Sequence, residues 1–445
     1  MVEVKPYWTK IRFFFNYHNW KNFFFSSPTR KKLTENFLSL SVLQGLNYLL
    51  PLITLPYLVR VLGPEKYGLV AFAQAFIAYF GILTDYGFNL SATREISIQR
   101  ENKEKISAIF SSVMLIKFVF LILSFILMSV LVFSIHKFRN EWLLYFLTFG
   151  TVLGQVLFPI WFFQGIERMK YITWLNIIAK TIFTVLVFVL IHQKTDYVYV
   201  PFLGALGTII SGVLALGIIR KHFKVNFHLP SKNEIIHQLR EGWYIFISTV
   251  AISLYSISNT FILGLFASNT IVGYYSGAEK IINAVQGLLS PISQTIYPHI
   301  SKIASESKER ALKFLQKITI LIGSSSFVLS LLIFLLAEVV VKILLGGQYL
   351  ESIKVLRILS FLPFIVGLSN IFGIQTMLTF DYKKAFSNIL IIASLINITL
   401  AFILVPFFFH IGIAFAVLIS ETFVTIVMFV YLQRKGIKVL EGKYV

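Results

Sequence analysis

The chain has 445 residues, of which 57% are hydrophobic and only 13% charged, and its mean hydropathy is +0.78. Soluble domains carry about 25% charged residues, so the composition excludes an ordinary soluble protein and indicates an integral membrane protein. The net charge of +20 is expected from basic loops on the inner side of a membrane rather than from nucleic-acid binding. The absence of cysteine excludes disulfides and thiol catalysis.

The first 33 residues mix aromatic and basic side chains, as in "WTKIRFFFNYHNWKNFFF". They contain too many polar residues to span a bilayer, and no small-residue cleavage site indicates a signal peptide. We predict an arm, residues 1–33, that lies on the cytoplasmic membrane surface.

Twelve apolar segments follow, each long enough to cross about 30 Å of hydrocarbon. If the N-terminus is cytoplasmic, the cytoplasmic segments hold 29 of the 40 Lys and Arg residues, and the outer loops hold 8. This asymmetry predicts an even number of spans with both termini cytoplasmic. The predicted spans are approximately 34–59, 67–90, 106–135, 142–163, 171–192, 197–219, 242–266, 270–299, 314–337, 353–379, 384–405 and 409–432.

The two halves of the chain resemble each other. Residues 60–105 align without gaps on 265–310, so that Gly68 falls on Gly273, and 158–170 aligns on 372–384. We therefore predict an all-α protein of two pseudo-symmetric six-helix lobes, 34–222 and 242–445, joined by a basic cytoplasmic linker, 223–241. Parallel repeats of this kind place a substrate cavity between the lobes.

Polar residues recur at helical spacing inside several spans. In the second span Gln74 and Asp85 share a face, and the repeat maps this face onto the one that carries Glu279 in the eighth span. Polar side chains within a membrane usually face protein or a water-filled cavity. The candidate cavity-lining amides are Asn47, Gln74, Asn176, Asn259, Asn283 and Gln286.

Charged residues within spans are candidates for binding or for ion pairs. A lysine at mid-membrane costs at least about 2.5 kcal/mol on insertion scales, so Lys180 and Lys280 either line a cavity or pair with acidic residues on neighbouring helices. Lys117 lies nearer the cytoplasm and either lines the cavity or extends its ammonium group to the membrane interface. Three acidic residues are candidate proton or sodium sites, with structural pairing as the alternative reading: Asp85, Glu279 and Glu421.

Arg60 ends the first span in "LPYLVRVLGPEKYG". It is either an anchor at the outer membrane boundary or a phosphate ligand at the cavity rim, because guanidinium binds phosphate in a bidentate way. The sequence contains no P-loop and no metal-ligand cluster, and it predicts no enzymatic activity, no metal and no cofactor.

The segment "LPYLVRVLGPEKYGLVAFAQAF", followed by "DYGFNLSATREIS" and "ENKEKI", resembles the first two spans of the O-antigen and polysaccharide flippases of the multidrug/oligosaccharidyl-lipid/polysaccharide exporter superfamily. The resemblance is strongest over 35–120. It implies two lobes around a cavity that opens to either side of the bacterial cytoplasmic membrane. It also implies a substrate carried on undecaprenyl pyrophosphate, with a polysaccharide polymerase and chain-length proteins as partners and no nucleic acid.

On this interpretation the diphosphate would contact Arg60, Lys117, Lys180 and Lys280, because cationic side chains neutralise phosphate. The amides would bind sugar hydroxyls, and an ion gradient would drive alternating access. A drug or cation exporter of the same superfamily is the first alternative. A polytopic polymerase or ligase is the second, although the outer loops are short for sugar chemistry. A membrane scaffold, the third, would not need aligned polar faces.

Overall fold

The computed structural model describes residues 28–439, except for the side chains of parts of α3, α11 and α12. Within this range the secondary structure is helical, without strands. The predicted arm, residues 1–33, lies almost entirely outside the described residues, as does the end of the C-terminal tail.

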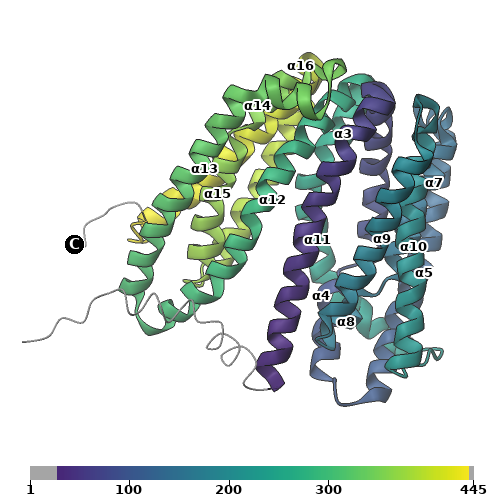
Figure 1. The fold of residues 1–445 in the computed structure, drawn as a ribbon. Helices are drawn as coiled ribbons and strands as arrows, with labels where there is room; N and C mark the ends of the chain where they lie inside the picture. The colour runs from purple at the N-terminus through teal and green to yellow at the C-terminus, as the bar shows by residue number, and fades with distance from the viewer. Residues whose placement is uncertain (1–27, 440–445) are drawn as a thin grey trace, which may run out of the picture.

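The N-terminal half runs from a long bent helix to the linker, and its helices lie together on the right of Figure 1. Its elements are α3 (Pro28–Asp85), α4 (Phe88–Ile98), α5 (Lys103–Ser134), α6 (His136–Arg139), α7 (Trp142–Leu157), α8 (Ile160–Gly165), α9 (Met169–Leu190), η1 (Lys194–Val198) and α10 (Tyr199–His222).

The C-terminal half begins within the predicted linker, because residues from Lys232 onward are already helical. Its elements are α11 (Lys232–Phe266), α12 (Asn269–Glu306), α13 (Lys308–Leu344), η2 (Gly347–Tyr349), α14 (Ser352–Leu359), α15 (Leu362–Asn370), the π-helix η3 (Ile371–Leu378) and α16 (Lys383–Arg434).

Two of these helices contain a sharp bend. In α3 the backbone of Gly63 has φ 68°, a left-handed conformation that glycine adopts without a Cβ penalty, and Pro64 then starts the second leg at its fixed φ. In α16 the bend is at Phe409, with φ 46°. Each of the twelve predicted spans therefore coincides with a helix, a leg of a bent helix or a series of short helices.

Eight segments of the described chain are long and apolar enough to cross a bilayer. Two of them, Ile53–Ile98 with 46 residues and Lys383–Arg434 with 52, exceed the roughly 20 residues that one crossing needs. The bend at Phe409 allows two crossings in the second segment, whereas in the first the bend at Gly63 leaves one crossing after it and joins it to the N-terminal leg of α3, which starts at Pro28. The more polar α11 and α12 do not meet the length and hydropathy criterion over their described residues.

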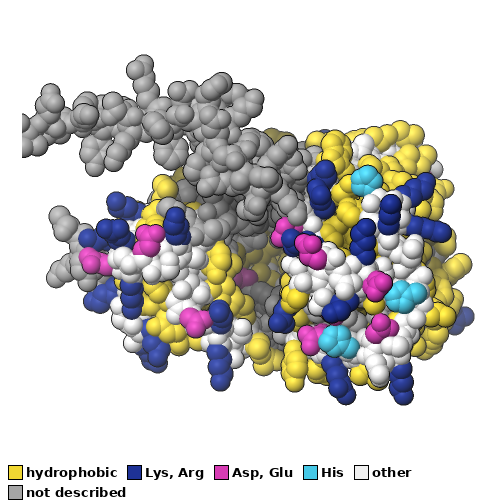
Figure 2. Space-filling view, turned by 90° about the horizontal axis from the view of Figure 1, so that it is seen from below, with side chains coloured by type: hydrophobic (Ala, Val, Ile, Leu, Met, Phe, Trp, Pro, Cys, Tyr) yellow, Lys and Arg dark blue, Asp and Glu magenta, His cyan; other side chains and the backbone are white. Residues whose placement is uncertain are grey.

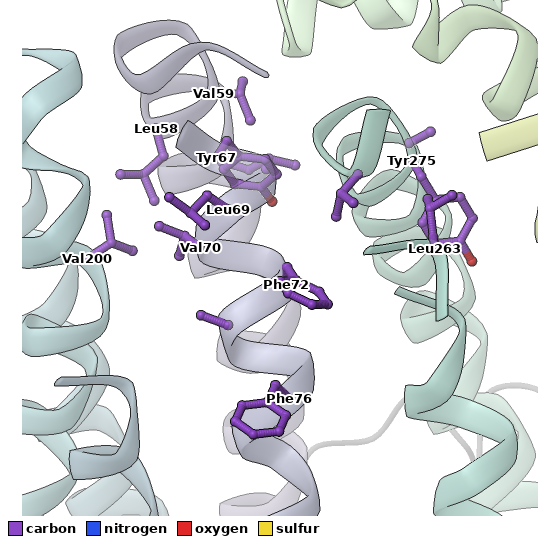
Figure 3. Packing of buried hydrophobic residues seen from close by; sticks show 14 of the residues in the cluster. Leu58, Val59, Tyr67, Leu69, Val70, Phe72, Phe76, Val200, Leu263 and Tyr275 are labelled. Carbon is purple, nitrogen blue, oxygen red and sulfur yellow. The ribbon is translucent and has the colours of Figure 1, made fainter. Parts of the chain in front are cut away.

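The two halves share an apolar core, and α11 also packs against the N-terminal half at the other end. One buried cluster joins both halves, with Tyr67 and Phe72 of α3 beside Leu263 of α11 and Tyr275 of α12 (Figure 3). Two further clusters lie elsewhere: one around Trp161 in the N-terminal half, against which Ile235 and Leu239 of α11 also pack, and one around the π-helix in the C-terminal half. The helices accordingly converge at the top of Figure 1 and diverge toward the bottom.

The closest approach of the halves is between α3 and α12. A Cβ on Gly68 would lie 1.9 Å from the carbonyl oxygen of Asn269, and one on Gly273 would lie 1.9 Å from that of Pro64. Only glycine permits two backbones to pack this closely. The two glycines that the repeat aligns are thus the contact between the repeats.

The opposite end of the molecule carries the basic loops. Figure 2 shows Lys and Arg side chains gathered over both halves on this lower face. At this end α11 packs against the N-terminal half, where Gln238 donates to Glu95 at 2.6 Å and His237 lies 3.4 Å from the same carboxylate.

Candidate functional site

A pocket of about 280 Å³ lies within the N-terminal half. Both legs of α3 contribute to it, together with α9 and α10. Lys180 and Gln74, two of the predicted cavity residues, lie in its wall beside Thr54. Among the described residues Lys180 has no carboxylate within ion-pair distance, so its ammonium group is available to a ligand.

A second pocket, of about 270 Å³, lies within the C-terminal half. It brings together five predicted site residues from α11, α12 and α16: Asn259, Glu279, Asn283, Gln286 and Glu421. The repeat places Asn259 opposite Thr54 and Glu279 opposite Gln74, so the two pockets occupy corresponding positions in the two halves.

Glu279 in the wall of the second pocket is held by two hydrogen bonds. Its two carboxylate oxygens accept hydrogen bonds from Thr260 at 3.3 Å and Tyr275 at 3.1 Å. The Oδ1 atom of Asn259 in the same wall is buried and has no hydrogen-bond partner among the described residues. Carboxylate and amide oxygens are ligands that suit a hard cation or a proton.

Two lysines from opposite halves interact electrostatically. Lys180 on α9 and Lys280 on α12 carry like charges, and their electrostatic interaction is unfavourable. Lys280 is exposed in the structure, beside Glu279 in the sequence. Because like charges destabilise each other at short range, this pair favours an anion between the halves.

Lys117 and Asp85 form an ion pair instead of standing alone. Their side chains are 3.3 Å apart, and Lys117 is only 3% exposed. Asp85 is the last residue of α3 and is followed by a left-handed turn at Tyr86 and Gly87. The sequence left structural pairing open for Asp85, whereas for Lys117 the alternative was a side chain that reaches the membrane interface; the structure pairs the two residues.

Arg60 lies at the seam between the halves. Its guanidinium donates to the carbonyl oxygen of Ile343, near the C-terminal end of α13, where the helix dipole favours a cation. Lys137 makes the matching contact from the same half, because it donates to the carbonyls of Gly264 and Ala267 at the end of α11. Burial lowers the pKa of Lys137 from its ordinary value.

The remaining predicted residues lie apart from the two pockets. Asn176 donates to the backbone of Ile172 at 2.8 Å on its own helix and is not in the wall of either pocket. The side chain of Asn47 falls outside the described residues. The sequence interpretation missed Tyr275 and Lys137; Tyr275 could have been found from its spacing of four residues before Glu279, whereas the contact of Lys137 with α11 has no local signal.

Comparison with known proteins gives the family. The family model for "Polysaccharide biosynthesis protein" matches residues 33–304. A protein of Escherichia coli (strain K12) named "Putative O-antigen transporter" is 36% identical over 93% of this chain and all of its own length. A protein of the same name from Shigella dysenteriae is 29% identical over 89% of this chain and 99% of its own.

Solved structures show the same fold. Lipid II flippase MurJ in an inward closed conformation superposes with a TM-score of 0.67 at 18% identity, covering 88% of this chain and 87% of that one. An inward-facing multidrug resistance MATE family transporter of the MOP superfamily gives 0.66 at 15% identity, covering 89% and 96%. The all-helical polytopic membrane class is thereby confirmed, and the chain belongs to the family of polysaccharide biosynthesis proteins.

Proposed function

We propose that the chain is a flippase that moves undecaprenyl-pyrophosphate-linked oligosaccharide units from the inner to the outer leaflet of the bacterial cytoplasmic membrane. The match to an O-antigen transporter extends over 93% of the chain, and the relatives are named as transporters rather than enzymes. A diphosphate-sugar headgroup cannot cross hydrocarbon unaided, so a polar path between helices is required.

The observation that carries this proposal is the position of Lys180 in the wall of a pocket without a carboxylate in ion-pair distance among the described residues, with Lys280 of the other half adding a like charge. Two mutually repelling ammonium groups gain stability when a diphosphate lies between them, because charge-assisted hydrogen bonds to phosphate are strong. The amides of the second pocket, Asn283 and Gln286, suit sugar hydroxyls. Arg60 at the seam would meet the phosphate as the headgroup leaves.

The proposed topology has twelve spans, both termini in the cytoplasm, and two six-helix lobes (34–222 and 242–445) around a central cavity. The basic lower face supports the cytoplasmic assignment of that end. In this orientation the shared core and the Gly68–Gly273 contact close the outer side, while the divergence of the helices toward the other end supports an opening toward the cytoplasm. Alternating access would require the outer contacts of Arg60 and Lys137 to break.

Ion coupling is assigned to the second pocket. Glu279 and Glu421 share its wall with the buried Asn259 oxygen, which supports a proton or sodium site there. Asp85 is paired with Lys117, which favours a structural role for both residues over coupling or substrate binding.

The function can be tested by deleting the gene in the bacterium that carries it. Lipid-linked repeat units should accumulate in the inner leaflet, and the wild-type gene should restore export. A Lys180→Gln/Lys280→Gln variant should insert normally and fail to restore export, whereas Lys302→Gln/Lys384→Gln, which removes two exposed lysines elsewhere, should restore it. Export by the first variant at the wild-type level would refute the cationic site.

A multidrug or cation exporter is the second candidate, because the fold matches a MATE transporter and one pocket is acidic. Deletion would then change drug susceptibility without accumulation of lipid-linked glycan. The like charges of Lys180 and Lys280 favour an anionic substrate instead.

A further inference from the structure

A surface site outside the two pockets lies at the basic end of the N-terminal half, where the linker between the halves runs along α5. The cavity there has a volume of about 560 Å³. Its wall carries the lysines Lys103 and Lys105 from the first turn of α5 and Lys224, with His228, from the linker. Neither the transport cycle nor the ion site uses these residues.

An apolar crevice of about 230 Å³ adjoins this cavity along the same two segments. Phe110, Met114 and Phe118 of α5 form one wall, and Val225 and Phe227 of the linker form the other, with Arg220 at the edge. Along α5 the lysines come first, at the start of the helix, and the phenylalanine side chains follow in its apolar part.

The linker separates these two surfaces by simple alternation. Residues 225–230 have no regular helix, whereas Lys224 before them has a left-handed backbone with φ 55°; where the chain is extended, successive side chains point to opposite sides. Lys224, Asn226 and His228 line the basic cavity, whereas Val225 and Phe227 line the crevice. The segment is therefore amphipathic with a period of two.

Local contacts hold this segment against α5. The backbone N–H of His228 donates to Ser111 at 3.1 Å, and the His228 ring lies 3.4 Å from the same hydroxyl. Val225 is buried, and its N–H donates to Ile219 of α10. At the far end Ser231 and Glu234 form a capping box that starts α11.

The charges favour an anion although two acids share the cavity. Glu234 accepts the N–H of Ser231 at 2.6 Å, which lowers its pKa and commits it to the helix start. Glu104 lies in the first turn of α5. Among the side chains that the structure describes, no ion pair involves Lys103, Lys105 or Lys224, so these three lysines line the cavity without a described carboxylate partner.

We propose that this amphipathic groove binds an anionic phospholipid of the surrounding leaflet, with the phosphate on Lys103, Lys105 and Lys224 and one acyl chain against Phe118 and Phe227. Basic pockets beside transmembrane helices attract anionic headgroups, and exposed apolar side chains such as Phe227 suit the acyl region. Apolar side chains of α5 such as Ile122 and Phe125 are exposed, so this helix is not covered by other helices along that side and the groove is accessible to bilayer lipid.

The test uses the full-length protein in detergent and counts bound lipids by native mass spectrometry. Dioleoylphosphatidylglycerol should bind with higher affinity than dioleoylphosphatidylcholine. Lys103→Gln/Lys105→Gln/Lys224→Gln should weaken phosphatidylglycerol binding by at least about tenfold, since each lysine near a membrane surface contributes about a fivefold gain in affinity. Lys302→Gln/Lys317→Gln/Lys384→Gln removes three exposed lysines of the other half and should leave binding unchanged.

A second pair of variants tests the acyl-chain contact without altering charge. Phe227→Ser should weaken phosphatidylglycerol binding, whereas Leu229→Ser, at a side chain that is 84% exposed and outside the crevice, should not. Equal binding by the lysine variant and its control would overturn the proposal, and so would equal affinity for the two lipids. Undecaprenyl phosphate that displaces phosphatidylglycerol at lower concentration would assign the groove to substrate instead. None of these outcomes depends on whether export occurs.

Discussion

The pocket of the N-terminal half and the pocket of the C-terminal half occupy equivalent places but carry opposite charge. The first presents Lys180, with Gln74 beside it. The second presents Glu279 and Glu421 at corresponding depth. Where the repeat places an amide in one half, it places a carboxylate in the other.

This difference indicates how two copies of one architecture can divide a task. Under the predicted repeat the helices that build both pockets correspond, while single side chains in their walls differ. A basic wall suits the anionic part of a substrate, and an acidic wall suits the ion that drives the cycle. The two roles can then be altered separately.

The equivalence of the halves is tested most severely at their contact. Gly68→Ala and Gly273→Ala should each strongly reduce the yield of folded protein, because a Cβ would overlap a backbone carbonyl and overpacking costs about 1–3 kcal/mol or more. Thermal unfolding in detergent measures the loss. Gly217→Ala, where a Cβ meets nothing within 4 Å, is the control. A large difference between the two seam variants would break the proposed equivalence.

The sign of the charge in the N-terminal pocket can be reversed. Lys180→Glu would make this pocket as acidic as the other and should reduce export by about a hundredfold, since a hydrogen bond to a charged group contributes about 1.5–3 kcal/mol and repulsion adds to the loss. Lys180→Arg keeps the charge and should retain most export. Radiolabelled repeat-unit transport into inverted vesicles measures both, and equal activity would show that charge there is irrelevant.

Removing charge from the C-terminal pocket should have a narrower effect. Glu279→Gln should weaken cation binding by about tenfold while leaving glycan binding intact, because an amide keeps the hydrogen-bonding shape without the charge. The expected result is export that no longer responds to an imposed proton or sodium gradient. Asp85→Asn should instead reduce stability, because it leaves Lys117 buried without its partner; a coupling defect in this variant alone would reassign the ion site.

The smallest expected effect concerns pH at the outer seam. Burial lowers the pKa of Lys137 from 10.5. Its ammonium group is therefore charged at neutral pH, when it donates to the carbonyls of α11, and loses this charge as the pH rises through the lowered pKa. Spin labels at Trp142 and Leu350 should therefore report a longer distance between the halves at alkaline pH. Lys137→Arg stays charged and should show no change; the same pH dependence in both proteins would exclude Lys137 as the cause.

The sequence predicted the long-range plan better than the individual contacts. Apolar length located the spans, and the repeat paired Gly68 with Gly273, but no pattern indicated that these two glycines touch each other. Helical spacing on α12 correctly grouped Glu279, Asn283 and Gln286, because residues on one face of one helix stay together. The Lys117–Asp85 pair and the contact of Arg60 with Ile343 join different helices, and such pairings depend on packing that a single sequence does not encode locally.

The bend of α3 at Gly63 has a consequence for how the protein enters the membrane. The two legs are separated by a single non-helical residue, so no loop exists that could be translocated by itself. In the proposed orientation the first two spans must insert together as a helical hairpin, with Arg60, Glu65 and Lys66 carried across the hydrocarbon at its tip. Their transfer is an early cost of biogenesis, and the hairpin is complete before the rest of the chain arrives to hold Arg60.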